Sequence, residues 1–172
     1  MGAPAPGTWL DLGSGGGLPG LVLAWHWSRS RAVLLDANLR RTDALQRAVA
    51  ALDWAGRVRV LRARAEVAGR EPEWRRSQQV VVVRSFGPSA VVAECAAPFL
   101  EAGGHLVVSE PPARGDVSGH PDRWPAPALS ELGLRPLHFS QGDFGYQVLV
   151  QTHPCPDRFP RRTGVPAKRP LF

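Results

Sequence analysis

The chain has 172 residues, enough for one domain with a substantial hydrophobic core, and a formal net charge of +6. Its two cysteines are too few for a disulfide framework, and neither they nor the histidines show the spacing of metal ligands. No segment has the ~18 consecutive apolar residues of a membrane span, and the first residues do not resemble a signal peptide. We therefore expect a cytoplasmic monomer that binds neither a metal nor a membrane.

Strands and helices are predicted to alternate along most of the chain. Strands are expected at 7–12, 31–35, 57–61, 79–83 and 105–108, and helices at 19–28, 38–54 and 88–100. A proline-rich loop at 111–127 precedes a short helix at 128–132, and a hairpin then joins strands 134–139 and 146–151. The valine run in 79–83 is typical of a strand covered on both faces, whereas the arginines in 57–61 indicate an edge strand.

This pattern predicts an α/β fold: a doubly wound, mostly parallel Rossmann-like sheet with an antiparallel last strand. We assign a single domain, with residues 1–152 as its body and residues 153–172 as a basic, proline-rich C-terminal tail of the same domain.

The first predicted strand leads into a glycine-rich turn with the sequence DLGSGGGLPG. Glycines lack Cβ and tolerate positive φ, so Gly13 and Gly15 let the backbone approach a cofactor closely. Asp11 stands directly before the glycines, where a carboxylate would repel the pyrophosphate of a dinucleotide. It suits a cation instead, such as the ammonium of a methionine moiety, so we expect S-adenosylmethionine as the cofactor and a fold of the class I methyltransferase type.

Ligands of such sheets bind beyond the carboxyl ends of the strands. Asp36 ends the second predicted strand, and its carboxylate can accept both hydroxyls of a ribose; the alternative is that it caps the next helix. Glu66, Arg84 and Glu110 follow later strands and are expected at the same edge.

Most of the net charge lies in residues 157–172, which hold five basic residues and one acid. We expect four of the basic side chains to contact RNA phosphates: Arg161, Arg162, Lys168 and Arg169. The prolines of this tail favour an extended path. The alternative is a structural strap in which Phe159, Val165 and Leu171 dock on the sheet.

Several segments resemble the bacterial ribosomal RNA small subunit methyltransferase G family, also called the glucose-inhibited division protein B family. They are DLGSGGGLPG, LLDAN, RARAE, the Arg84-Ser85-Phe86 segment and, most specifically, RFPRRTGVPAKRPLF. The resemblance runs from the first strand to the C-terminus, without the helical segment that usually precedes that strand. It implies methyl transfer from S-adenosylmethionine to N7 of a guanine in 16S ribosomal RNA, with that RNA or the small ribosomal subunit as partner. It also implies cofactor contacts for Gly13, Leu18, Asp36, Ala65, Glu66 and Arg84.

Guanine N7 carries a lone pair and no proton, so its methylation needs positioning and no general base. We therefore name no certain catalytic residue; Arg84 is a positioning candidate that can bond guanine O6 or the carboxylate of the cofactor. Two alternative functions stay open. One is a methyltransferase for another acceptor, which Glu110 favours because the family usually has Lys-Gly after this strand. The other is a non-catalytic RNA- or ribosome-binding relative.

Overall fold

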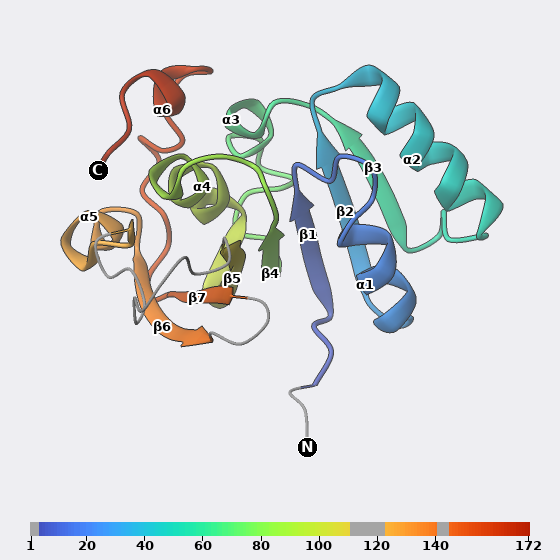
Figure 1. Ribbon diagram of the computed structural model, residues 1–172, viewed down its shortest axis with the longest axis horizontal. Helices are drawn as coiled ribbons and strands as arrows, with labels where there is room; N and C mark the ends of the chain where they lie inside the picture. Colours follow the sequence, from blue (N-terminus) through green and yellow to red (C-terminus); the bar gives the residue numbers. More distant parts are fainter. Residues whose placement is uncertain (1–3, 111–122, 141–144) are drawn as a thin grey trace.

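The computed structural model describes residues 4–110, 123–140 and 145–172 (Figure 1). Its strands are β1 Thr8–Leu12, β2 Arg31–Asp36, β3 Val58–Arg62, β4 Gln78–Val83, β5 Leu100–Glu110, β6 Leu134–Ser140 and β7 Gly145–Gln151. Its helices are α1 Gly20–His26, α2 Leu39–Ala51, α3 Ala65–Ala68, α4 Ser89–Ala96, α5 Ala126–Ser130 and α6 Val165–Lys168, with a 3-10 turn, η1, at Ala97–Phe99.

The seven strands form one sheet in the order β3-β2-β1-β4-β5-β7-β6. The first five strands pair in parallel, and β7 lies antiparallel to both β5 and β6. The chain runs outward from β1 to β3 and then returns to place β4 on the other side of β1. The strand order therefore reverses between β1 and β4, where sheets of this kind bind ligands. The expected fold class is confirmed.

Apolar side chains alternate along the central strands and fill a core on each face of the sheet. Trp9, Leu34 and Val82 pack against α1 and α2 on one face. Leu10 and Val81 pack with α4, α5 and part of the tail on the other face. Figure 1 shows α1 and α2 on one side of β1 and α4 on the other. Successive strand residues point to opposite faces. The polar side chain of Asp11 in β1 therefore lies on the same face as Trp9, the face that α1 covers.

The edge position of β3 and the double coverage of β4 match the sequence analysis. Three features differ from it. Helix α3 was not expected, β5 begins at Leu100 and includes the Gly103-Gly104 segment, and the tail contains the short helix α6. Residues 111–122 of the predicted loop and the hairpin connection at 141–144 lie outside the described residues. Among those described, no helix has the length and apolar character needed to cross a membrane.

Candidate functional site

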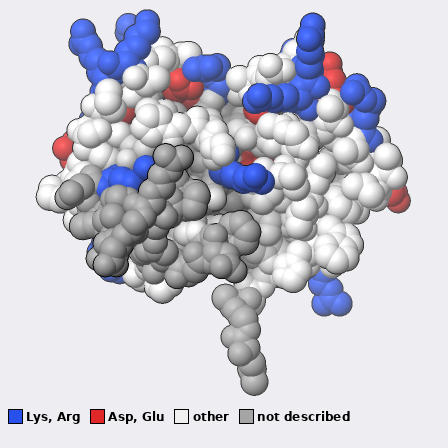
Figure 2. Space-filling view, in the orientation of Figure 1, with Lys and Arg blue, Asp and Glu red and all other residues white. Residues whose placement is uncertain are grey.

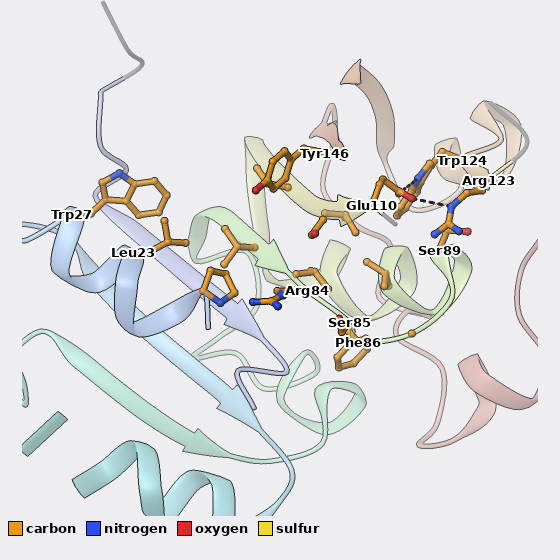
Figure 3. A pocket seen from close by; sticks show the side chains of 18 residues that line it. Leu23, Trp27, Arg84, Ser85, Phe86, Ser89, Glu110, Arg123, Trp124 and Tyr146 are labelled. Carbon is orange, nitrogen blue, oxygen red and sulfur yellow. Dashed lines mark hydrogen bonds and ion pairs between the residues drawn. The ribbon is translucent and has the colours of Figure 1, made fainter. Parts of the chain in front are cut away.

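Two adjoining cavities lie at the carboxyl ends of the parallel strands. The smaller, of about 300 Å³, is enclosed by the glycine-rich turn, the end of β2, α3, α4 and α6. The larger, of about 840 Å³, lies between α1, the ends of β4 and β5, and β7 (Figure 3). Ser85 and Phe86 line both cavities. A ligand in the smaller cavity and a second molecule in the larger one would therefore meet at the end of β4.

The glycine-rich turn is shaped by positive φ angles and fastened to β2. Gly13, Gly15 and Gly17 have φ of 77°, 56° and 96°, which side chains with a Cβ adopt only with strain. The backbone N–H groups of Gly13 and Ser14 both donate to the Leu35 carbonyl, at 2.8 and 3.0 Å. A Cβ at Gly13 would lie 2.6 Å from the Phe86 ring. Glycine at position 13 is therefore required by packing as well as by conformation.

Asp36 lines the smaller cavity and holds the turn in place. Its Oδ2 accepts from the N–H of Gly15 at 2.9 Å, and its Oδ1 accepts from the N–H of Asn38 at 2.8 Å. The N-cap of α2 is Asn38, whose side chain accepts from the N–H of Arg41. The capping alternative for Asp36 is therefore wrong. Its bond to Gly15 joins the acid to the glycine-rich turn, a link that the sequence analysis did not find.

Asp11 is placed differently from the other candidate residues. Its carboxylate lies on the α1 side of β1, against the backbone of Gly20, and lines neither cavity. It is 1 % exposed, and Oδ2 has no hydrogen-bond partner among the described residues. Burial raises the pKa of the Asp11 carboxyl to about 6. Its contact with a cofactor ammonium stays a prediction.

The remaining candidates for the cofactor are spread around the two cavities. Ala65 and Glu66, at the start of α3, line the smaller cavity, and Arg84 lines the larger one. Leu18 is exposed and lines neither cavity.

Glu66 is already bound within the protein. Its Oε1 accepts from the N–H of Gly164 at 2.9 Å and is 3.4 Å from Nη2 of Arg64. Burial opposes ionisation, but these donors outweigh it, and the pKa of Glu66 is lowered. Glu66 therefore joins α3 to the C-terminal tail as a carboxylate.

The tail is fastened to the body of the domain. The Nε of Arg161 donates to both carboxylate oxygens of Glu94, at 2.8 and 3.0 Å, and Glu94 is 0 % exposed on α4. From the body, Arg75 donates to the carbonyls of Cys155 and Phe159. Phe159 itself is buried in the core.

Four basic residues were expected to contact RNA. One of them, Arg161, instead pairs with Glu94 inside the protein. Arg162, Lys168 and Arg169 are exposed and form no ion pair with the described residues. Figure 2 shows Lys and Arg side chains gathered along the edge where Figure 1 places α6 and the start of α2. The strap alternative therefore describes the anchored part of the tail, while three cations stay free for a partner.

Aromatic side chains from distant parts of the chain surround the larger cavity. Figure 3 shows Trp27, the residue after α1, with Tyr146 of β7 and Trp124 around the cavity, and Arg84 between the α1 side and the Glu110 side. Glu110 is fixed at the far wall: Trp124 Nε1 donates to Oε1 at 2.7 Å, and Arg123 Nε lies 3.0 Å from Oε2. These aromatics gave no signal in the sequence, because they have no common spacing.

Metal and thiol chemistry are not indicated by the described residues, which contain no group of three or more His, Cys, Asp or Glu placed to hold a metal. Cys95 lines the smaller cavity, but burial raises the pKa of its thiol to about 12. At neutral pH this cysteine is a protonated apolar wall and not a nucleophile.

Solved structures with the same arrangement of strands and helices define the class of fold. A SAM-dependent methyltransferase from Aquifex aeolicus superposes with a TM-score of 0.59 over 83 % of this chain and 80 % of its own, at 15 % identity. Geranyl diphosphate C-methyltransferase from Streptomyces coelicolor A3(2), solved with S-adenosyl-L-homocysteine, gives 0.62 over 86 % and 73 %, at 13 % identity. The fold is that of the class I S-adenosylmethionine-dependent methyltransferases.

Sequence comparison defines the family. Residues 3–111 match the GidB family model, described as rRNA small subunit methyltransferase G. The ribosomal RNA small subunit methyltransferase G of Prochlorococcus marinus (strain MIT 9313) is 36 % identical over 98 % of this chain and 70 % of its own length. That of Rubrobacter xylanophilus is 33 % identical over 97 % of this chain and 66 % of its own. The chain belongs to the rRNA small subunit methyltransferase G family, and S-adenosylmethionine is its cofactor.

Proposed function

We propose that this protein transfers the methyl group of S-adenosylmethionine to N7 of a guanine in 16S ribosomal RNA. The observation that carries the proposal is the pair of cavities that share Ser85 and Phe86 at the switch point of the sheet. One can hold the adenosine part of the cofactor and the other an acceptor base. The names of the relatives support small-subunit ribosomal RNA as the substrate, and so do the exposed cations on the tail.

The residues of the smaller cavity fit the cofactor. The Asp36 carboxylate, 7 % exposed, borders the cavity with acceptor capacity beyond its two backbone bonds, as a ribose diol requires. The Ala65 and Cys95 side chains supply apolar walls for an adenine. The turn at Gly13 allows the backbone to lie close to the ligand.

The cofactor supplies an electrophilic methyl group on a sulfonium sulfur. The role of the chain is then to bring the guanine in line with it and to exclude water. The aromatic rings of Trp27 and Tyr146 suit a planar base, because base–aromatic stacking contributes about 1–3 kcal/mol per base. The Arg84 guanidinium can hold guanine O6 or the carboxylate of the cofactor while N7 stays free to attack.

The second candidate is a methyltransferase with another acceptor. Glu110 favours it, because a carboxylate in the wall of the larger cavity would repel a phosphate. In this structure Arg123 lies against Glu110, which reduces that repulsion.

The deciding experiment is expression of this chain in a bacterium that lacks its own enzyme of the family, followed by mass mapping of 16S ribosomal RNA. We expect one guanine to gain a methyl group, and to lose it when Asp36→Ala replaces the wild type. RNA without the modification, together with tight binding of S-adenosylhomocysteine, would favour the second candidate. RNA binding without any cofactor binding would contradict the proposed function. Activity on ribosomal RNA also requires a cytoplasmic location.

A further inference from the structure

The C-terminal tail reaches the smaller cavity. Ala167 of α6 lines that cavity together with Ala65, Glu66 and Cys95, residues that come from α3 and α4. Figure 1 shows α6 near α3 and α4. The chain thus closes the cavity with a segment that lies roughly 100 positions beyond α3 in the sequence numbering.

The position of α6 is fixed on the side that faces the cavity. The N–H of Gly164, directly before α6, donates to Glu66 Oε1 at 2.9 Å. Gly164 has a φ of 81° and a Cβ there would meet no atom within 4 Å, so glycine serves the backbone conformation and not close packing. Three residues earlier, Arg161 is held by Glu94. These bonds join the segment before α6 to α3 and α4, two of the elements that line the cavity.

The outer side of the same short segment carries positive charge. Lys168 and Arg169 directly follow Ala167, and both are exposed. A residue that borders the cofactor cavity is therefore followed at once by two cations that can reach a phosphate. A displacement of the backbone of α6 would move all three residues, because they lie in this four-residue helix and its C-cap.

We propose that α6 is a wall of the cofactor site and that, through it, RNA binding and cofactor binding favour each other. The inference rests on the proposed function, since it takes the smaller cavity as the place of the adenosine moiety and the tail as a contact for RNA. The bonds of Arg161 and Gly164 hold the N-terminal side of α6, and RNA held by Lys168 and Arg169 adds a restraint at its C-terminal end. By thermodynamic linkage, the cofactor must strengthen RNA binding by the same factor.

The wall is tested by Ala167→Leu, which adds a larger side chain at an exposed position bordering the cavity. Ala50→Leu is the matched control, since Ala50 is an exposed alanine near the far end of α2. Calorimetry with S-adenosylhomocysteine is expected to show at least a tenfold loss of affinity for Ala167→Leu and no change for Ala50→Leu. Melting temperatures without ligand should be equal to that of the wild type for both variants.

The coupling is tested by titrating S-adenosylhomocysteine at fixed salt with and without transcribed 16S ribosomal RNA. We expect RNA to raise the affinity of the wild type by roughly 5- to 150-fold, the usual range of such coupling. In Lys168→Gln/Arg169→Gln, measured with RNA at a concentration that saturates the variant, this rise should be lost.

The outcomes separate this inference from the function on which it rests. Equal affinities for wild type and Ala167→Leu would overturn the wall, and an affinity that RNA does not change would overturn the coupling. In both cases binding of S-adenosylhomocysteine that Asp36→Ala weakens would leave the cofactor site intact. Absence of binding to the wild type would overturn the proposed function itself.

Discussion

At the scale of single residues, Asp36 has a structural role, and we propose that it also binds the ligand. Its two backbone bonds fix the turn and the start of α2, and the same carboxylate borders the cavity. Removing a charged hydrogen-bond acceptor costs ~1.5–3 kcal/mol. We therefore expect Asp36→Ala to weaken binding of S-adenosylhomocysteine roughly 10- to 150-fold, measured by calorimetry.

The control for this prediction is Asp36→Asn, which keeps one acceptor oxygen and should lose less affinity than alanine. NAD should bind to neither protein. Wild-type affinity in Asp36→Ala, or tight binding of NAD, would contradict the assignment of the cavity.

Asp11 offers a prediction about pH. Its carboxyl has a pKa of about 6 in the folded protein, against 3.8 for an unperturbed aspartate, so it holds its proton more tightly when the chain is folded. Its contribution to stability is complete below about pH 4 and is lost as pH rises towards 6, a change of about 3 kcal/mol. Asp11→Asn should therefore be more stable than the wild type at pH 7, with a difference that vanishes near pH 4.

Denaturant unfolding of both proteins between pH 4 and pH 8 measures this difference. A constant difference over that range would show that Asp11 does not titrate as its burial implies. The same variant tests the ammonium contact: S-adenosylmethionine should bind more weakly to Asp11→Asn if the carboxylate serves the ligand. Unchanged affinity would assign Asp11 to the packing under α1 alone.

At the scale of elements, the glycine-rich turn allows a matched comparison. Gly13→Ala places a Cβ 2.6 Å from the Phe86 ring at a φ of 77°, whereas a Cβ at Gly16 meets nothing within 4 Å. We expect Gly13→Ala to lower the free energy of unfolding by about 1–3 kcal/mol and to weaken cofactor binding. Gly16→Ala should change stability little. Thermal melts with and without S-adenosylhomocysteine give both quantities, and equal behaviour of the two variants would contradict this account of the turn.

The elements that sequence analysis predicted are those with a clear period or end signal. The strands β1, β2 and β4 follow from apolar runs, and α2 from helical spacing closed by Gly56. Helix α3 has only four residues, which is too few to show a helical period in the sequence. Prolines made the tail look extended, yet Pro166 sits in the first turn of α6, where its missing N–H costs nothing.

The residues of the candidate site, too, could be predicted from the sequence only in part. The sequence placed Asp36 and Gly13 correctly at the carboxyl edge, because both lie within or beside one local motif. It could not find the pairing of Arg161 with Glu94, since these residues are 67 positions apart and only the folded chain brings them together. It also could not foresee that Asp11 lies under α1, because it considered spacing along the strand and not the alternation of faces across it.

At the scale of the whole molecule, the basic tail is anchored to the body of the domain, and we propose that it also binds RNA; two variants separate these roles. Arg162→Gln/Lys168→Gln/Arg169→Gln removes three exposed cations without internal ion pairs among the described residues. Each lost phosphate contact should reduce the slope of log affinity against log salt by about 0.7–0.9. We expect weaker RNA binding, a smaller slope and an unchanged melting temperature.

Arg161→Gln is the contrasting variant, because it leaves the Glu94 carboxylate buried at 0 % exposure without its ionic partner. Breaking a buried pair in this way costs about 3–5 kcal/mol, which for a domain of this size lowers the melting temperature by roughly 6–20 °C. The salt slope should stay as in the wild type, since Arg161 already has an internal acceptor. If the triple variant keeps the wild-type slope while its melting temperature falls, the whole tail is architecture, and RNA must be bound by another surface. If Arg161→Gln alone flattens the slope and melts normally, its pairing with Glu94 gives way to phosphate in solution, and the anchored part of the tail belongs to the RNA interface after all.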